Sequence, residues 1–171
     1  MELITLNGTD LKVSRACLGT MTFGGQADEK ASRIMVDLAF ERGINFFDTA
    51  NSYTSGRSEE FLGRILKGRR EKAVLASKVR SRWGPDPDQV GLKPGAMQKA
   101  LDATLKRLQT DYLDLYYLHQ PDPEAPLAET LDAMEKFIRA GKVRYPAQSN
   151  YAAWQHAQGL SLAKEKGYKP I

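Results

Sequence analysis

The chain has 171 residues, of which 42% are apolar and 27% charged, and its formal net charge is +4 from 25 basic and 21 acidic side chains. This length is typical of one domain with a sizeable core, so we expect residues 1–171 to form a single domain. The charges are interleaved, and the one basic run, at 67–72, lacks the aromatic residues and motifs of a nucleic-acid binder. The balance argues against a nucleic-acid partner but suits an anionic ligand such as a phosphorylated cofactor.

Cys17 is the only cysteine, which excludes a disulfide within the chain and is typical of a reducing cytoplasm. It lies in the apolar stretch 16–18, so we expect a buried, unreactive thiol. No segment is apolar for long enough to span a bilayer, and the first residues lack the features of a signal peptide. We therefore expect a cytoplasmic protein without a membrane partner.

Short apolar runs, typical of buried strands, alternate along the chain with longer stretches of helical periodicity. A hairpin is predicted first, from 3–6 and 11–13 around the Gly-containing loop 7–10. The predicted strands that follow cover 15–19, 44–48, 73–79, 112–119 and 142–149. The predicted helices cover 28–42, 57–67, 93–108, 127–139 and 152–166. Residues 80–91 read as a loop, and Pro170–Ile171 as the start of a further strand.

Five strand–helix units predict an α/β fold with a parallel sheet, either an open doubly wound sheet or part of an eightfold barrel. The run after the first strand, residues 19–25, does not have the glycine spacing of a nucleotide-binding open sheet. Polar residues instead follow successive strands, which is typical of a barrel active site. They are Asp48, Lys78, His119 and the pair Ser149–Asn150. The pattern favours a partial (β/α)8 TIM barrel that one chain does not close.

Three of these polar residues, with Tyr53, form a candidate catalytic set. Taken singly, Asp48 is a cap, Tyr53 a packing residue and His119 a core histidine. Lys78 differs because an ammonium in a buried strand requires a partner. Together they support one chemistry: an ammonium paired with a carboxylate favours a nearby phenolate, so a phenol beside it becomes a stronger acid. A neutral imidazole can then hydrogen-bond a carbonyl oxygen as charge develops.

None of these side chains can donate a hydride, so the reduction of a carbonyl would require a cofactor. No set of metal ligands is expected.

Several segments, in order and spacing, resemble the aldo-keto reductase family, and the fine pattern is similar to its bacterial branch near the potassium-channel beta subunits. The segments are NFFDTANSY at 45–53, GRSEEFLG at 56–63, residues 76–79, residues 111–122, residues 141–144 and residues 18–24. The resemblance implies a barrel in which Tyr53 is the proton donor, Lys78 and Asp48 tune it, and His119 orients the carbonyl. The implied substrate is a small aldehyde or ketone.

The resemblance also implies NADPH as the hydride source. The residues that it places beside the cofactor are Gly19, Thr20, Met21, Asp48, Ser149 and Asn150, the last two at the nicotinamide carboxamide. Trp83 falls in the long loop that lines the family's substrate pocket, although a tryptophan that merely packs at the rim fits the sequence equally well.

Two features depart from the family pattern. Only five strand–helix units are present where a closed barrel needs eight. The resemblance implies that most of the residues that bind the cofactor belong to the later units. The last predicted strand also carries Pro146, Ala147 and Gln148 where the family has an apolar residue, glycine and valine. Because proline removes a ladder donor, we expect this strand to be distorted or to be an edge.

These features leave two main hypotheses open. The first is an NADPH-dependent carbonyl reductase. The second is a catalytically inactive partial barrel, natural or engineered, that forms homo-oligomers to cover its open sides. A third hypothesis is a regulatory module like the channel-associated relatives. It is less favoured because those proteins keep the part of the fold that binds the cofactor, and most of that part is missing from this chain.

Overall fold

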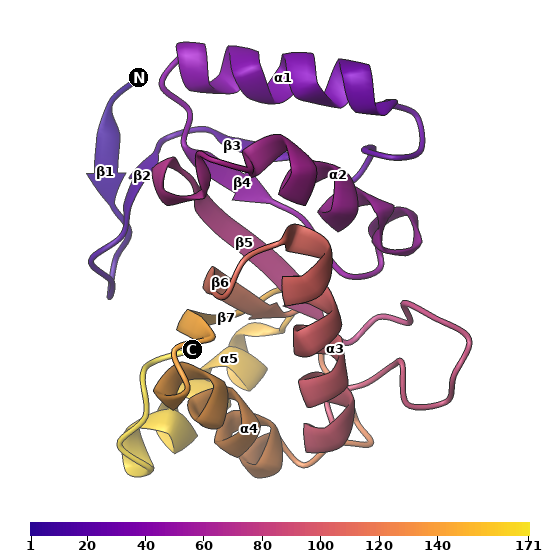
Figure 1. Ribbon diagram of the computed structural model, residues 1–171. Coiled ribbons are helices and arrows are strands. Elements are labelled where there is room, and N and C mark those ends of the chain that lie inside the picture. The colour runs from indigo at the N-terminus through magenta and orange to yellow at the C-terminus, as the bar shows by residue number, and fades with distance from the viewer.

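The computed structural model describes all residues, 1–171, and its main feature is a five-stranded parallel sheet (Figure 1). The strands lie side by side in chain order. Each is therefore joined to its neighbour by a helical connection, without the reversal that defines a doubly wound sheet. The prediction of a partial, unclosed barrel is confirmed. The strands are β3 (Cys17–Gly19), β4 (Phe46–Asp48), β5 (Val74–Val79), β6 (Leu113–Leu118) and β7 (Val143–Gln148).

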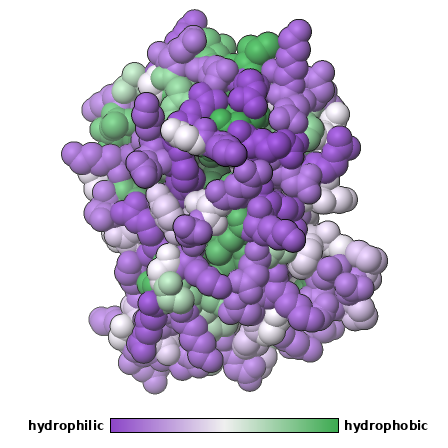
Figure 2. All heavy atoms as spheres, viewed as in Figure 1, coloured by the Kyte–Doolittle hydropathy of each residue, from purple (hydrophilic) through white to green (hydrophobic).

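One α-helix follows each strand, and the helices line one face of the curved sheet (Figure 1). Asp28 caps the first helix by accepting a hydrogen bond from the backbone N–H of Ala31 at 2.7 Å. None of the helices has the length and apolar character required to cross a bilayer. Hydrophilic side chains predominate on the face seen in Figure 2. The helices are α1 (Glu29–Glu41), α2 (Arg57–Leu66), α3 (Pro94–Leu108), α4 (Leu127–Arg139) and α5 (Ala153–Glu165), with short 3-10 turns at Tyr53–Gly56 and Arg70–Lys72.

Alternate residues of the strands face the helices and the inner side of the sheet. Leu75 and Val79 of β5 face the helices and belong to the larger hydrophobic cluster of 28 buried residues. Val74 and Ala76 face inward and belong to a smaller cluster with Leu115. The core between sheet and helices therefore holds the fold together, and the inner face is left to the site.

The hairpin of β1 (Leu3–Thr5) and β2 (Lys12–Ser14) covers the inner face where the strands begin. Leu11 and Val13 are almost fully buried there, against the smaller cluster. Burial of each such side chain contributes roughly 1.5–3 kcal/mol. The hairpin thus closes the end of the sheet at which the strands begin, here called the lower end. The end at which the strands terminate, here called the upper end, stays open.

A buried carboxylate ties the lower end of the sheet together. Asp114 accepts hydrogen bonds from Arg70 Nη2, Arg144 Nη1 and the backbone N–H of Leu75, each at 2.9 Å. Arg144 also donates to Asp10 Oδ1 at 2.8 Å, which joins β7 to the hairpin loop. Both oxygens of Asp114 are satisfied, so the charge is stabilised although the residue is only 2% exposed.

Two expectations about individual residues are wrong. Cys17 is exposed rather than buried, because it lies on the inner face of β3, an outermost strand of this sheet. Surrounding protein, and secondarily the charge of Asp48, nonetheless raise the pKa of its thiol to about 12, so it remains protonated. Pro170–Ile171 does not begin a strand; the Ile171 side chain is instead buried, close to Gly159 of α5.

The structure resolves the two alternatives for the proline-containing strand. β7 is the outermost strand in this chain, and it pairs with β6 at a constant offset, with Pro146 opposite Tyr116. The strand is therefore an edge with a regular register. An edge position tolerates proline because only one side of the strand needs ladder donors.

Candidate active site

The predicted catalytic residues meet where the strands end, on the inner face. Asp48 is the last residue of β4, Lys78 is next to last in β5, and His119 directly follows β6. Parallel pairing places Asp48 opposite Ala76, and Lys78 opposite Tyr117. The sheet register alone thus brings side chains far apart in sequence to one edge.

Lys78 is the centre of this group. Lys78 is only 6% exposed as a residue, and its ammonium forms an ion pair with Asp48 Oδ1. It also donates to the Thr49 carbonyl oxygen at 2.8 Å and to the Tyr53 hydroxyl oxygen at 3.1 Å. Each of the three ammonium hydrogens therefore has an oxygen partner, which stabilises a cation in a buried strand.

Tyr53 is held by a turn with an unusual backbone. The two following residues, Thr54 and Ser55, have left-handed φ values of 47° and 55°, and Gly56 has a φ of 89°. Such conformations cost non-glycine residues roughly 1 kcal/mol each. The Thr54 hydroxyl donates to the Phe23 carbonyl at 2.6 Å and so anchors the turn. The tight turn returns the chain at once into α2 and keeps the phenol over Lys78.

His119 lies against the phenol. The ring centroids of Tyr53 and His119 are 5.9 Å apart and the rings are nearly perpendicular, at 77°. Its Nδ1 is 3.5 Å from the Ser81 hydroxyl. Burial, and secondly the positive charge of Lys78, lower the pKa of the His119 imidazole below its ordinary value. The ring is therefore neutral at neutral pH, which leaves an N–H free to donate to a carbonyl oxygen.

The sequence interpretation missed two neighbours of this group. The Tyr117 ring lies on the same face as Lys78, whose Nζ is 6.0 Å from the ring centroid. Burial, and then the charge of Asp48, raise the pKa of the Tyr117 phenol. Tyr117 lies two residues before His119, so strand alternation predicts that both side chains are on the same face of the sheet. Ser81 had no such signal, because it begins an irregular loop.

The predicted contacts for the nicotinamide carboxamide lie beside His119. Asn150 has a left-handed φ of 59° and donates from Nδ2 to the His119 carbonyl at 2.8 Å and to Ser149 Oγ at 3.1 Å. Its amide oxygen accepts no hydrogen bond in the chain, so it remains available to an amide donor.

The segment after β3 shows a mixed outcome. Gly19 is exposed, a Cβ there would meet no atom within 4 Å, and Met21 is 62% exposed, so both face open space. Thr20 is buried instead, and its contact with the cofactor stays a prediction. Its hydroxyl donates to the Asp48 carbonyl at 3.0 Å and bonds the Ser58 hydroxyl at 2.9 Å. With its backbone groups also engaged, Thr20 fixes the rim.

Trp83 lies away from the group around Lys78. It is partly buried against the hydrophobic core, and the guanidinium carbon of Arg107 in α3 is 5.2 Å from its ring centroid. This is the packing alternative that the sequence left open. A contact between Trp83 and a substrate stays a prediction.

The sheet topology is that of an unclosed barrel, and the candidate residues gather where its strands end. The comparisons with known proteins agree: the family model for the aldo/keto reductase family matches residues 15–171. The chain belongs to the aldo/keto reductase family.

Individual relatives give the same result. The chain is 41% identical to the uncharacterized oxidoreductase YrpG of Bacillus subtilis, over 98% of this chain and 55% of that protein. It is 37% identical to the aldo-keto reductase YhdN of the same organism, over 91% and 49%. It is 36% identical to a probable voltage-gated potassium channel subunit beta of Arabidopsis thaliana, over 95% and 51%. The chain thus spans about half the length of the curated relatives it matches.

Proposed function

We propose that this chain forms the proton-donor part of a site that reduces aldehydes or ketones with NADPH as the hydride source. The observation that carries the proposal is the 3.1 Å hydrogen bond from the buried Lys78 ammonium to the Tyr53 hydroxyl oxygen, next to the His119 ring. This arrangement is that of a phenol prepared to release a proton.

The chemistry of each residue follows from its contacts. When bound, the reduced nicotinamide supplies a hydride to the carbonyl carbon. The carbonyl oxygen gains negative charge and takes the hydroxyl proton of Tyr53. Lys78 stabilises the phenolate that remains, because its ammonium already donates to that oxygen. Asp48 holds the ammonium in place, and the neutral His119 imidazole donates to the carbonyl oxygen and orients it.

The residues present suit the nicotinamide end of the cofactor. The unused amide oxygen of Asn150 is an acceptor for the carboxamide, and the Ser149 hydroxyl lies beside it. Gly19 and Met21 leave open space on the opposite side of the group. Residues of this chain would therefore hold the nicotinamide and orient it against Tyr53.

The proposal is tested by titrating NADPH into the purified protein and following nicotinamide fluorescence, with the molecular mass recorded in the same buffer. We expect saturable binding that the Asn150→Ala variant weakens by about tenfold, the effect of one lost polar contact to a bound group. Gln98→Ala, an exposed change on α3, is the matched control and should bind as the parent does. Failure to bind NADPH at millimolar concentration would contradict the proposal.

A second candidate is a partial barrel without activity that associates with copies of itself. Exposed apolar side chains favour it: Ile34, Met35 and Leu38 on α1 are 43–58% exposed, and Leu160 on α5 is 37% exposed. These helices follow β3 and β7, the two outermost strands. Mass that rises with protein concentration, together with an absence of NADPH binding, would support this candidate over the reductase. A monomer would contradict it.

A further inference from the structure

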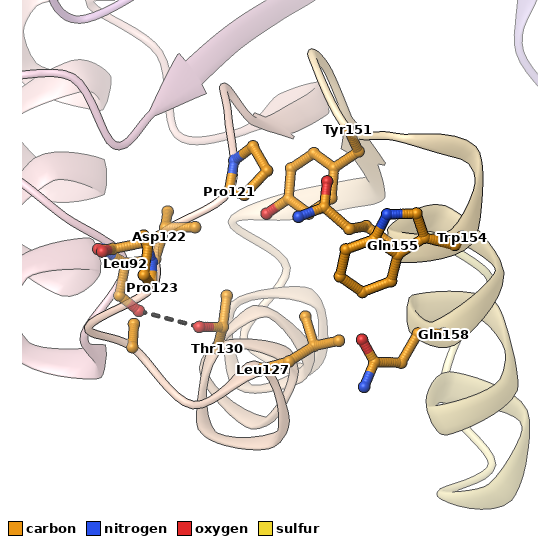
Figure 3. A pocket seen from close by; sticks show the side chains of 11 residues that line it. Leu92, Pro121, Asp122, Pro123, Leu127, Thr130, Tyr151, Trp154, Gln155 and Gln158 are labelled. Carbon is orange, nitrogen blue, oxygen red and sulfur yellow. Dashed lines mark hydrogen bonds between the residues drawn. The ribbon is translucent and has the colours of Figure 1, made fainter.

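A hollow that contains none of the four catalytic candidates lies between the starts of α4 and α5 (Figure 3). Its volume is about 300 Å³, the lower end of the range for ligand pockets. The walls come from the loop that follows β6 and from the first turns of the two helices. Because α4 and α5 are consecutive helices of this chain, both walls of the hollow are defined by the structure.

The floor and sides of the hollow are apolar and aromatic. Leu92, at the floor, is only 1% exposed, and Leu127 and Pro121 line the sides. Trp154 stands at the opening with 68% of its surface exposed, beside Tyr151 (Figure 3). A large aromatic side chain left so exposed at a hollow with another aromatic wall offers a surface on which a flat ring can pack.

The polar groups at the hollow have unused hydrogen-bonding capacity. Gln155 accepts from the backbone N–H of Ala152 at 2.9 Å through its side-chain oxygen, which leaves its amide nitrogen free. The Tyr151 hydroxyl, the Trp154 indole N–H and the Gln158 amide form no hydrogen bond within the chain. An apolar hollow edged by a few unpaired polar groups is the usual composition of a small-molecule site.

The charge at the hollow selects among ligands. Asp122 lies in its wall, where Oδ2 accepts from the Leu92 N–H at 2.7 Å and Oδ1 from the Glu124 N–H at 3.2 Å. Burial, and secondly the charge of Asp122, raise the pKa of the Tyr151 phenol to about 12, so this hydroxyl keeps its proton. Asp122 is the only charged residue that lines the hollow; the cation that acts on the Tyr151 phenol, Arg80, has a smaller effect on it than Asp122 and lies outside the lining. The single carboxylate disfavours anions and favours uncharged or cationic molecules.

We propose that this hollow binds a small aromatic molecule of one or two rings, uncharged or cationic, with its ring against Trp154 and Tyr151 and its edge toward Asp122. The inference does not rest on the proposed reductase function, because it uses none of the residues that carry that function.

Three probes of similar size test the inference: indole, which is uncharged, benzylamine, which is cationic, and benzoate, which is anionic. The signals of the two indole N–H groups, Trp83 and Trp154, are followed by NMR and assigned with the Trp154→Phe variant. We expect indole and benzylamine to shift the Trp154 signal with saturation at millimolar concentration. Benzoate should bind about tenfold more weakly, because its carboxylate meets Asp122.

Variants distinguish binding in the hollow from nonspecific binding elsewhere on the protein. Trp154→Ala should weaken benzylamine binding by about fivefold or more, the contribution of an aromatic pair; because this variant lacks the Trp154 signal, binding to all variants is compared through the NMR signals of benzylamine itself. Since Trp154 is mostly exposed, this change should leave the fold intact, which circular dichroism checks. Leu160→Ala, an exposed apolar change on the same helix outside the hollow, should bind as the parent does. Binding that does not saturate, that is equal in both variants, or that is as tight for benzoate would overturn the proposal.

Discussion

The sheet carries a buried or half-buried carboxylate paired with a cation at each of its two ends, and the two centres differ in what they leave unused. At the lower end, Asp114 receives three donors, from Arg70, Arg144 and the Leu75 backbone, and both its oxygens are satisfied. At the upper end, Asp48 and the ammonium of Lys78 form an ion pair that also bonds a phenol. The phenol hydrogen is left for another partner, beside a neutral imidazole.

The difference separates a structural ion pair from the ion pair that we propose to act in catalysis. A satisfied pair that joins three elements stabilises the fold and has no proton or hydrogen-bonding position to offer a ligand. The upper pair is built around Tyr53, which can donate its proton, and it faces the open end of the sheet. Charge and burial alone therefore do not identify a site, because both centres have them. What distinguishes the upper centre is a hydrogen-bond donor, the Tyr53 hydroxyl, that has no partner within the chain.

The largest expected effect on stability concerns the lower centre. Asp114→Ala leaves Arg70 and Arg144 without their shared carboxylate, so we expect a loss of about 3–5 kcal/mol in the free energy of unfolding, measured by urea denaturation. Asp102→Ala, which removes an exposed ion pair with Lys142, should cost less than about 1 kcal/mol. Equal losses in the two variants would remove the distinction between the buried and the exposed pair.

A smaller effect is expected at the upper centre. Lys78→Met replaces the ammonium by an apolar side chain of similar length, and Asp48, whose side chain is 26% exposed, can then bind water. We expect the free energy of unfolding to change by no more than about 1 kcal/mol in either direction. A loss as large as that of Asp114→Ala would show that the upper pair, like the lower one, is needed for folding.

The smallest effect is a protonation shift at His119. Because its pKa is lowered in the folded chain, the unfolded chain binds more protons just below pH 6.5, the ordinary value for histidine. The contribution of His119 to the free energy of unfolding should therefore be fully present above pH 6.5 and be lost as the pH falls through the folded pKa. In an NMR titration the His119 signal, identified by its absence from His119→Gln, should have its midpoint below 6.5. A midpoint above 6.5 would contradict the buried, cation-facing geometry.

Much of this contrast was predictable from residue types and strand ends. The five strand–helix units followed from hydrophobic periodicity, and the positions of Asp48, Lys78 and His119 at successive strand ends predicted one common edge. The position of Tyr53 did not follow from periodicity. It depends on a left-handed backbone at Thr54 and Ser55, which threonine and serine do not predict. The family resemblance supplied it instead.

Other details required the three-dimensional arrangement. Thr20 looked like a ligand-facing residue, yet its hydroxyl is used by Ser58 and by the Asp48 carbonyl, which lie 28 or more residues away. The exposure of Cys17 depends on which strand is outermost, and apolar neighbours in sequence do not show that. The hollow beside Trp154 combines residues from three segments, so no local pattern indicated it.

The central claim, that the upper centre is a carbonyl-reducing proton donor, is tested most directly by Tyr53→Phe, which removes only the hydroxyl. In an assay of NADPH-dependent reduction of an aromatic aldehyde, we expect the rate constant to fall by about 10²–10⁴-fold with little change in NADPH binding. Tyr145→Phe, which removes a hydroxyl bonded to Asp10 at the hairpin, should retain the parent rate. A Tyr53→Phe variant as active as the parent would contradict the account.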